Sequence, residues 1–257
     1  MSKIKNYKIQ EIKNGYGDQA YWRSVVLPNV PKKYHKHPKQ CIEVLQKRWR
    51  MLTVRLKRAG YGPIQRPIIF CQNCPPVGVR IDQFSRPCKL QKICPFCWGR
   101  RYTFKVWDKL LPVMFPGSNK LSVGGNVLTY FHQTNYGSLA TALRMLSSGG
   151  GEITLLRNRG VEVRGAFNLS YIRPLEDNKS YYLWSGGIAL TGHYKNELNG
   201  VAHCGYQPHV RKADLPDMFA KAMPYPTSTF KAEPGRLIAA LDATEGKRAL
   251  NFYGSLR

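Results

Sequence analysis

The sequence predicts an α+β fold, an antiparallel sheet with helices packed on one face, preceded by a basic helical module. Three observations predict it. β-rich stretches recur in the second half of the chain. Segments with helical periodicity separate them, in the order βαββ…αβ. The first half holds the clearest amphipathic helix and a cluster of cysteines with regular spacing.

Residues 1–39 form the first predicted segment, a basic extended arm. Proline fixes φ and removes a backbone donor, so it disfavours the interior of a helix. Three prolines fall in this stretch, namely Pro28, Pro31 and Pro38. His35 and His37 resemble a pair of metal ligands, but a charged lysine separates them and a proline follows. We therefore interpret PKKYHKHPK as a basic loop that faces a polyanion.

The clearest helix is predicted over residues 41–58, with Gly60 available to end it. Its apolar positions recur at steps of three and four, as expected for a helix with one face in the core. These positions are Ile42, Leu45, Trp49, Leu52 and Leu56. The other face is basic and carries Lys47, Arg48, Arg50, Arg55, Lys57 and Arg58. Six cations with no acid among them favour contact with phosphates.

Five of the seven cysteines fall within 27 residues, at positions 71, 74, 88, 94 and 97. Two Cys-x2-Cys pairs, Cys71/Cys74 and Cys94/Cys97, are separated by 19 residues. This spacing is typical of a four-thiolate structural zinc site. A disulfide framework is disfavoured because no secretory signal is recognisable. Cys88 is an alternative ligand, whereas the isolated Cys41 and Cys204 are interpreted as ordinary small apolar residues.

A second helix is predicted from Trp98 to Leu111, ended by Pro112. It begins at the last cysteine pair, so Arg100, Arg101 and Lys105 would project from its first turns as further phosphate contacts. Its aromatic residues, Trp98, Tyr102 and Trp107, are more typical of a core than of a base-stacking surface.

The second half predicts the sheet. The predicted strands begin with NVLTYFHQ, VEVRGAFNLSYIRPL and SYYLWSGGIALTG. SLATALRMLSS predicts a short helix with Ser138 as its N-cap, and LPDMFAKAM another. The C-terminal stretch from 234 predicts a helix, a glycine turn and a last strand. We divide the chain into an arm (1–39), a helix and zinc-binding module (40–115) and an α+β domain (116–257).

The net charge of the chain indicates what kind of partner it binds. Forty Lys and Arg against 15 Asp and Glu give a net charge of +25, so a polyanionic partner is expected, and nucleic acid is the commonest. Between Asp18 and Asp82 a single acid, Glu43, stands against thirteen basic residues. An anionic membrane is the weaker alternative, because no amphipathic terminal anchor is evident. No apolar run is long enough to span a bilayer, so we expect a cytoplasmic protein.

The motif CPFCWGRR, the β-rich middle and GKRALNFYGSLR together resemble the zinc-knuckle rolling-circle plasmid replication initiators, the His-hydrophobic-His endonucleases. The resemblance covers about residues 88–257. It implies DNA as the partner and supports Cys88 as a ligand, through a Cys-x5-Cys-Pro-x-Cys spacing. It also implies a divalent Mg or Mn ion, held by a histidine pair, and a tyrosine that attacks the scissile phosphate.

The chain differs from this family at the positions that should carry the catalytic residues. The strand that should carry the histidines has Trp184-Ser185-Gly186-Gly187-Ile188 instead. The preceding strand lacks the expected acid and has Asn168, Ser170 and Tyr171. Glu176 and Asp177 follow in a turn, and His193, His203 and His209 lie beyond the strand. Tyr225, with Lys231 downstream, is the remaining candidate nucleophile.

Three hypotheses follow. The first is a zinc-stabilised nucleic-acid-binding protein, DNA favoured over RNA, that has lost nicking. The second is an active nicking initiator that uses Tyr225 with some of His193, His203 and Glu176. The third is a basic structural component of a nucleoprotein assembly, which would bind DNA or RNA.

Overall fold

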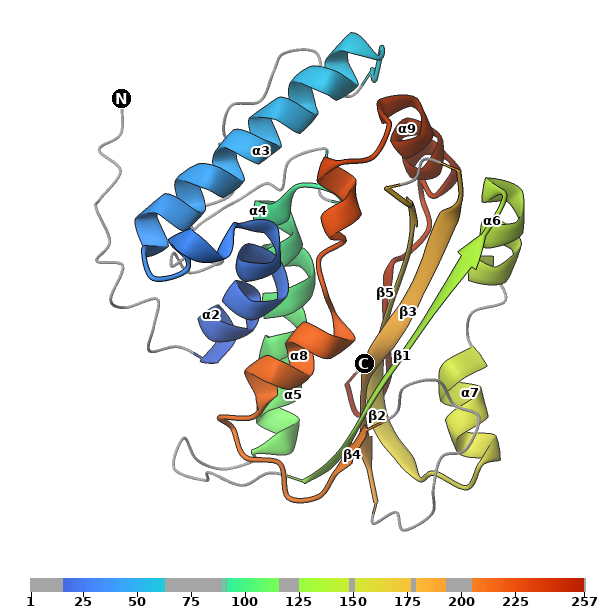
Figure 1. The fold of residues 1–257 in the computed structure, drawn as a ribbon. Coiled ribbons are helices and arrows are strands. Elements are labelled where there is room, and N and C mark those ends of the chain that lie inside the picture. The colour runs from blue at the N-terminus through green and yellow to red at the C-terminus, as the bar shows by residue number, and fades with distance from the viewer. Residues whose placement is uncertain are drawn as a thin grey trace.

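The computed structural model describes residues 16–62, 90, 92–115, 125–147, 151–176, 179–192 and 205–256. In these residues, five strands form one antiparallel sheet in the order β4-β1-β3-β2-β5 (Figure 1). The strands are β1 Asn126–Tyr136, β2 Val163–Pro174, β3 Tyr181–Thr191, β4 Gly205–Gln207 and β5 Leu250–Gly254. The predicted α+β class is therefore confirmed.

The centre of the sheet is the long β2–β3 hairpin. Both β1 and β2 run antiparallel to β3, so they are parallel to each other and are joined by a crossover. The crossover contains α6, Leu139–Ser147, and α7, Gly151–Asn158. This is a split β-α-β unit, with β3 inserted between the two parallel strands. Ser138 begins α6 as predicted, since its Oγ accepts a hydrogen bond from the amide of Thr141 at 3.2 Å.

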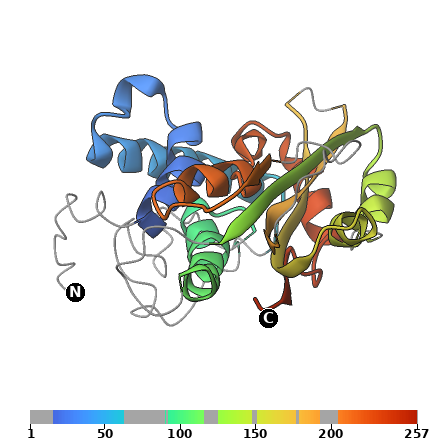
Figure 2. The same ribbon diagram turned by 90° about the horizontal axis from the view of Figure 1, so that it is seen from below.

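Helices cover both faces of the sheet, which corrects the prediction of one covered face (Figures 1 and 2). Neighbouring residues of a strand point to opposite faces. On β2, Phe167 and Leu169 join one hydrophobic cluster, whereas Ala166 and Ile172 join two others on the opposite face. Helix α8, Leu215–Ala222, covers the first face. Helices α6 and α7 cover the second. A strand that is apolar on both sides needs both layers.

The segment before residue 39 is helical over its described part, which corrects the prediction of an extended arm. It forms α2 Tyr16–Tyr21, η1 Trp22–Val26, η2 Leu27–Asn29 and η3 Lys32–Tyr34, and α3 follows as Pro38–Arg58. Pro28 and Pro38 occupy the first turn of η2 and of α3. An amide there has no partner within the helix, so proline starts these helices instead of breaking them.

The predicted second helix is confirmed with wider bounds. It is a run of α4 Pro95–Trp98, η5 Gly99–Phe104 and α5 Lys105–Met114. Pro112 lies inside α5 and does not end it. Trp107 packs against Phe219 of α8, with ring centroids 5.2 Å apart. In the part of the chain that the structure describes, no helix has both the length and the apolar content needed to cross a bilayer.

One hydrophobic cluster joins the three predicted segments. It contains Val25 from the first, Trp49 from the second and Phe219 from the third. Trp98 lies near its centre and contacts the rings of Tyr102, Tyr171 and Tyr225 at 4.6, 5.4 and 5.4 Å. The boundaries predicted at 39/40 and 115/116 therefore do not separate independent cores. The C-terminal elements η6 Thr227–Phe230 and α9 Pro234–Ala243 complete the fold.

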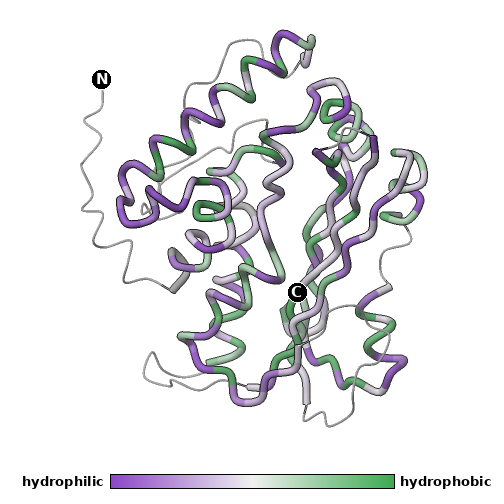
Figure 3. The backbone as a smooth tube through the Cα atoms, in the orientation of Figure 1, coloured by the Kyte–Doolittle hydropathy of each residue, from purple (hydrophilic) through white to green (hydrophobic). Residues whose placement is uncertain are grey.

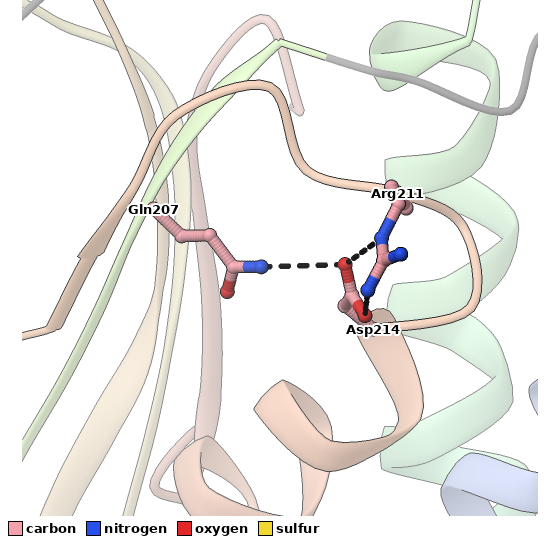
Figure 4. Close-up of polar contacts among 3 residues, drawn as sticks. All are labelled: Gln207, Arg211 and Asp214. Atoms are coloured by element: carbon pink, nitrogen blue, oxygen red, sulfur yellow. Dashed lines mark hydrogen bonds and ion pairs between the residues drawn. The ribbon is translucent and has the colours of Figure 1, made fainter.

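A polar junction fixes the start of α8 (Figure 4). The Arg211 guanidinium donates to both carboxylate oxygens of Asp214 at 3.0 Å. The side-chain amide of Gln207, at the end of β4, donates to the same carboxylate at 3.3 Å. The hydrogen bond from Arg211 is the main reason that the pKa of Asp214 is lowered. This junction connects the edge of the sheet to the helix that covers it.

Gly187, at the centre of β3, is required by its surroundings. A Cβ there would lie 1.9 Å from the carbonyl oxygen of Phe167 and 2.7 Å from the Tyr130 hydroxyl. That hydroxyl donates to the same carbonyl at 2.9 Å. We expect Gly187→Ala to lower the free energy of unfolding by about 3 kcal/mol, because it overpacks the core and breaks this hydrogen bond. Urea denaturation measures it.

Gly125→Ala is the matched control. A Cβ at Gly125 meets nothing within 4 Å. Its expected effect is below about 0.5 kcal/mol. Equal stabilities of the two variants would contradict the packing described around Gly187.

Candidate nucleic-acid interface and cysteine knuckle

A strongly basic exposed surface lies on η3 and α3. We call it the α3 basic surface and define it by eight exposed cations: Lys32, Lys33, Lys36, Lys39, Lys47, Arg50, Lys57 and Arg58. One exposed acid, Glu43, lies among them. In the described part of the chain, none of the eight forms an ion pair. Their charge is therefore available to an external polyanion.

Helix α3 presents this surface outward because its apolar stripe faces the core. Leu45, Trp49 and Leu56 are each 0% exposed. Figure 3 shows hydrophobic and hydrophilic segments alternating along α3, and Figure 1 places the helix at the periphery, away from the sheet. With 21 residues, α3 is about 30 Å long. A straight helix of this length can contact several consecutive phosphates of a nucleic-acid strand.

Four of the six cations predicted on this helix are exposed: Lys47, Arg50, Lys57 and Arg58. Arg48 is half-buried. The helix predicted over residues 41–58 begins three residues later than α3, so the prediction does not include Lys39. The available signal was Pro38, since proline favours the first position of a helix and would have included Lys39.

Arg55, the remaining predicted phosphate contact, is used inside the protein. Its guanidinium donates to the carbonyl oxygens of Phe230 at 3.0 Å and Ala232 at 2.6 Å. These bonds hold the turn between η6 and α9 against α3. Arg55 is more than 170 residues away in sequence from both acceptors, and a local sequence pattern cannot predict a contact over that separation.

This assignment predicts different outcomes for two neighbouring arginines. Arg55→Gln is expected to lower the free energy of unfolding by about 2 kcal/mol, because two carbonyl groups lose a charged donor. Arg50→Gln, on the exposed face, should change it by less than about 0.5 kcal/mol. Thermal and urea denaturation of the two variants compare them. An unfolding free energy unchanged by Arg55→Gln would show that its two hydrogen bonds do not hold the turn.

Three phosphate contacts are predicted after the last cysteine pair, Cys94/Cys97, which we call the knuckle. The structure describes the side chain of one of them, Lys105. Arg100 and Arg101 lie in η5, and their side chains are outside the described part of the structure. Lys105 is exposed on α5, with its ammonium 5.8 Å from the centre of the Phe252 ring. The ammonium of Lys109 lies 4.6 Å from the same ring. Lys105 is thus located beside β5, on a different part of the molecule from the α3 basic surface.

The knuckle itself is described at Cys94 and Cys97. Cys94 caps α4, and its sulfur accepts a hydrogen bond from the amide of Cys97 at 3.5 Å. Pro95 at the first helical position needs no acceptor. Both cysteines are 0% exposed, and neither is part of a disulfide. Predicted ligands Cys71 and Cys74 and the alternative Cys88 lie outside the described residues.

The two described thiols fit half of a structural zinc site. They lie one helical turn apart, as two ligands from one knuckle do, and zinc thiolates accept hydrogen bonds from backbone amides. The described residues contain no group of three or more His, Cys, Asp or Glu that could complete the site. Cys41 differs: its thiol donates to the carbonyl of Tyr34 at 3.1 Å, and burial raises its pKa.

Tyr225, the candidate nucleophile, is a core residue. It is 1% exposed, and its hydroxyl donates to the carbonyl of Ile93 at 2.5 Å. Burial raises the pKa of this phenol well above its ordinary value. A nucleophile must reach the scissile phosphate and lose its proton, and both requirements oppose this environment. In this arrangement Tyr225 supports the segment that leads into the knuckle.

The described structure does not form a catalytic site from the other residues at or near the positions where the resemblance to the initiators would place catalytic groups. Asn168, Ser170 and Ser185 form a buried hydrogen-bonded cluster on β2 and β3, with distances of 2.8 to 3.1 Å. Glu176 is exposed and pairs with Lys231 at 2.8 Å. His209 lies in the turn after β4 with a positive φ of 47°. The remaining candidates, Asp177, His193 and His203, lie outside the described residues.

Comparison of the chain with protein-family models, with curated proteins and with solved structures returns no match.

Proposed function

We propose that this protein binds nucleic acid, DNA in preference to RNA, along the α3 basic surface. The single observation that carries the proposal is the presence of eight exposed cations and one exposed acid on η3 and α3 and between them. Such a surface gains affinity mainly by releasing the counterions of the polymer. The resemblance to replication initiators favours DNA as the polymer.

We also propose a structural zinc ion at the cysteine knuckle. Cys94 and Cys97 would supply two ligands, and two of Cys71, Cys74 and Cys88 would supply the others. The ion would stabilise the packing around Trp98 and hold α4 and α5 in place. The chemistry that zinc supplies in such a site is structural, through four bonds to soft ligands.

Strand nicking is not part of this proposal, because of the burial of Tyr225. A covalent adduct between the protein and a single-stranded oligonucleotide, formed with Mg²⁺ or Mn²⁺ and lost in Tyr225→Phe, would require it to be added. Denaturing gel electrophoresis detects such an adduct directly.

Fluorescence anisotropy with duplex DNA, single-stranded DNA and RNA of one sequence tests the binding. The affinity should fall by orders of magnitude between about 50 mM and about 500 mM salt, because phosphate contacts carry the binding. DNA should displace RNA in competition. An affinity that is the same at both salt concentrations would exclude the proposal, and equal competition by RNA would favour a general nucleoprotein component.

A further inference from the structure

The outer face of α3 carries uncharged side chains as well as cations. Residues three, four or seven positions apart share a face of a helix. Gln40, Lys47, Met51, Val54 and Arg58 recur at these steps and form one row along α3. Four of the five are exposed, and Val54 is half-buried. We call these five residues the mixed row, because it combines an amide, two apolar side chains and two cations.

A second row runs beside the first and holds cations. Lys39, Arg50 and Lys57 each precede a member of the mixed row by one position, and all three are exposed. Glu43, the one acid in the sequence of α3, lies one turn from both Lys39 and Lys47. One edge of the outer face therefore suits phosphates, whereas the neighbouring strip also suits uncharged groups.

Met51 lies within this charged surface. Its side chain is 57% exposed, the largest exposure among the large hydrophobic residues that the structure describes. Lys47 and Arg55 lie one turn before and one turn after it on the helix. A single exposed apolar residue is ordinary on a protein surface. Here, however, a polyanion that contacts the surrounding cations also covers Met51, so such a partner must offer an apolar group there.

The shape of α3 allows it to enter a groove. Its six buried residues recur at helical steps on one side, so the rest of its circumference faces away from the core. Figure 1 shows the helix at the periphery of the molecule. An α-helix with its side chains is about 10–12 Å across, and the major groove of B-form DNA is about 12 Å wide. In that groove, phosphates border the edges of the bases.

The composition of α3 disfavours two other polymers. Proteins bind single strands by stacking bases on exposed aromatic rings, but the one aromatic residue of α3, Trp49, is 0% exposed. Double-stranded RNA has a deep, narrow major groove that side chains do not read. B-form DNA is thus the polymer in which both rows of α3 find a contact.

We propose that α3 lies in the major groove of duplex DNA, with the cationic row along the phosphates and the mixed row against the base edges. Met51 would contact the methyl group of thymine, which the major groove displays, and Gln40 would pair with adenine. This inference rests on the function proposed above. It adds the form of the DNA, the groove that α3 occupies and a residue that contacts the bases.

A duplex with a filled major groove tests the placement of α3. In a short mixed-sequence duplex, glucosylated 5-hydroxymethylcytosine in place of cytosine fills this groove with sugar and leaves the charge unchanged. The affinity of the full chain, measured by fluorescence anisotropy, should fall by about tenfold or more. Inosine in place of guanine removes an amino group from the minor groove only, so it should change the affinity by less than about twofold.

The outcomes separate this inference from the proposed function. Equal affinity for the glucosylated and the unmodified duplex, with the steep salt dependence retained, would overturn the groove assignment and leave the proposed function standing. Single strands that bind as tightly as the duplex would overturn it in the same way. Tighter binding to phosphatidylserine vesicles than to duplex DNA would assign the mixed row to a membrane. Absence of salt-dependent binding to any nucleic acid would overturn the proposed function itself.

Two exposed methionines provide a matched pair for the base contact. Met51→Ala changes α3, whereas Met145→Ala changes α6, where Met145 is 45% exposed. Selection from a random-sequence duplex library with the native protein supplies the probe, and resynthesis of that probe with uracil removes the thymine methyl groups alone. The native protein and Met145→Ala should lose about fourfold in affinity for the uracil probe, and Met51→Ala less than about twofold.

The same pair can refute the role of Met51. Equal sensitivity of Met51→Ala and Met145→Ala to uracil would exclude Met51 from the base contact. A library that yields no preferred sequence would exclude base contacts by the whole mixed row. Both methionines are exposed, so neither substitution should alter folding.

Discussion

Replacement of Cys94 by serine is expected to remove the proposed zinc ion and lower the melting temperature by roughly 10–20 °C. Structural zinc in small modules contributes about 10–16 kcal/mol of apparent binding free energy. A loss of only about 5 kcal/mol would shift the melting temperature by this amount in a chain of this size. Cys94 and Trp98 belong to the same buried cluster, so the loss should spread beyond the knuckle.

Metal analysis by mass spectrometry and differential scanning calorimetry measure the two effects. Cys41→Ser is the matched control, since Cys41 is equally buried and its hydrogen bond to the carbonyl of Tyr34 can be kept by a serine hydroxyl. It should retain the full zinc content with a small change in melting temperature. Unchanged metal content and stability in Cys94→Ser would exclude Cys94 as a zinc ligand.

The second large effect is expected on nucleic-acid affinity. The triple variant Lys47→Gln/Arg50→Gln/Lys57→Gln removes three exposed cations of α3 that span about 15 Å of the helix. Each phosphate contact contributes about 0.9 to the slope of log K against log salt concentration. The slope should therefore become shallower by about three, and the affinity at low salt should fall by at least about a hundredfold.

The control variant also removes three cations, but from a different part of the molecule. Arg144, Arg157 and Arg159 are exposed on and after α6 and α7, on the other side of the sheet from α3 (Figure 1). Their replacement by glutamine should leave the salt slope within about one of the native value. If both triple variants lose the same slope, binding follows net charge, and the α3 basic surface is not the interface.

Local patterns predicted most of the elements. The apolar positions of α3 repeat with a helical period that its burial matches, and the strands of the β2–β3 hairpin were recognisable from their β-rich composition. Two features were missed for local reasons. Helix α7 has only Ile153 and Leu156 as buried residues, too few for a periodic signal. Pro28 and Pro38 are predicted to break helices, whereas they lie in the first turns of η2 and α3.

The candidate site was less predictable because its contacts join distant segments. Arg55 has the same local pattern as its exposed neighbours, and only the fold brings it to Phe230 and Ala232. Tyr225 is predicted as the remaining candidate nucleophile, yet it is buried and packs against Trp98. Side-chain roles thus required the tertiary structure, whereas the positions of helices and strands mostly did not.

The two residues before the knuckle have a thermodynamic consequence. The carbonyl of Lys92 accepts from Arg173 of β2, and the carbonyl of Ile93 accepts from Tyr225. A metal held by Cys94 would therefore be linked to the sheet, and linkage is reciprocal. Any substitution that loosens Arg173 or Tyr225 should weaken metal affinity by the factor with which metal favours their ordered positions. Metal affinity would then measure how well the sheet is packed, at a distance from the thiols themselves.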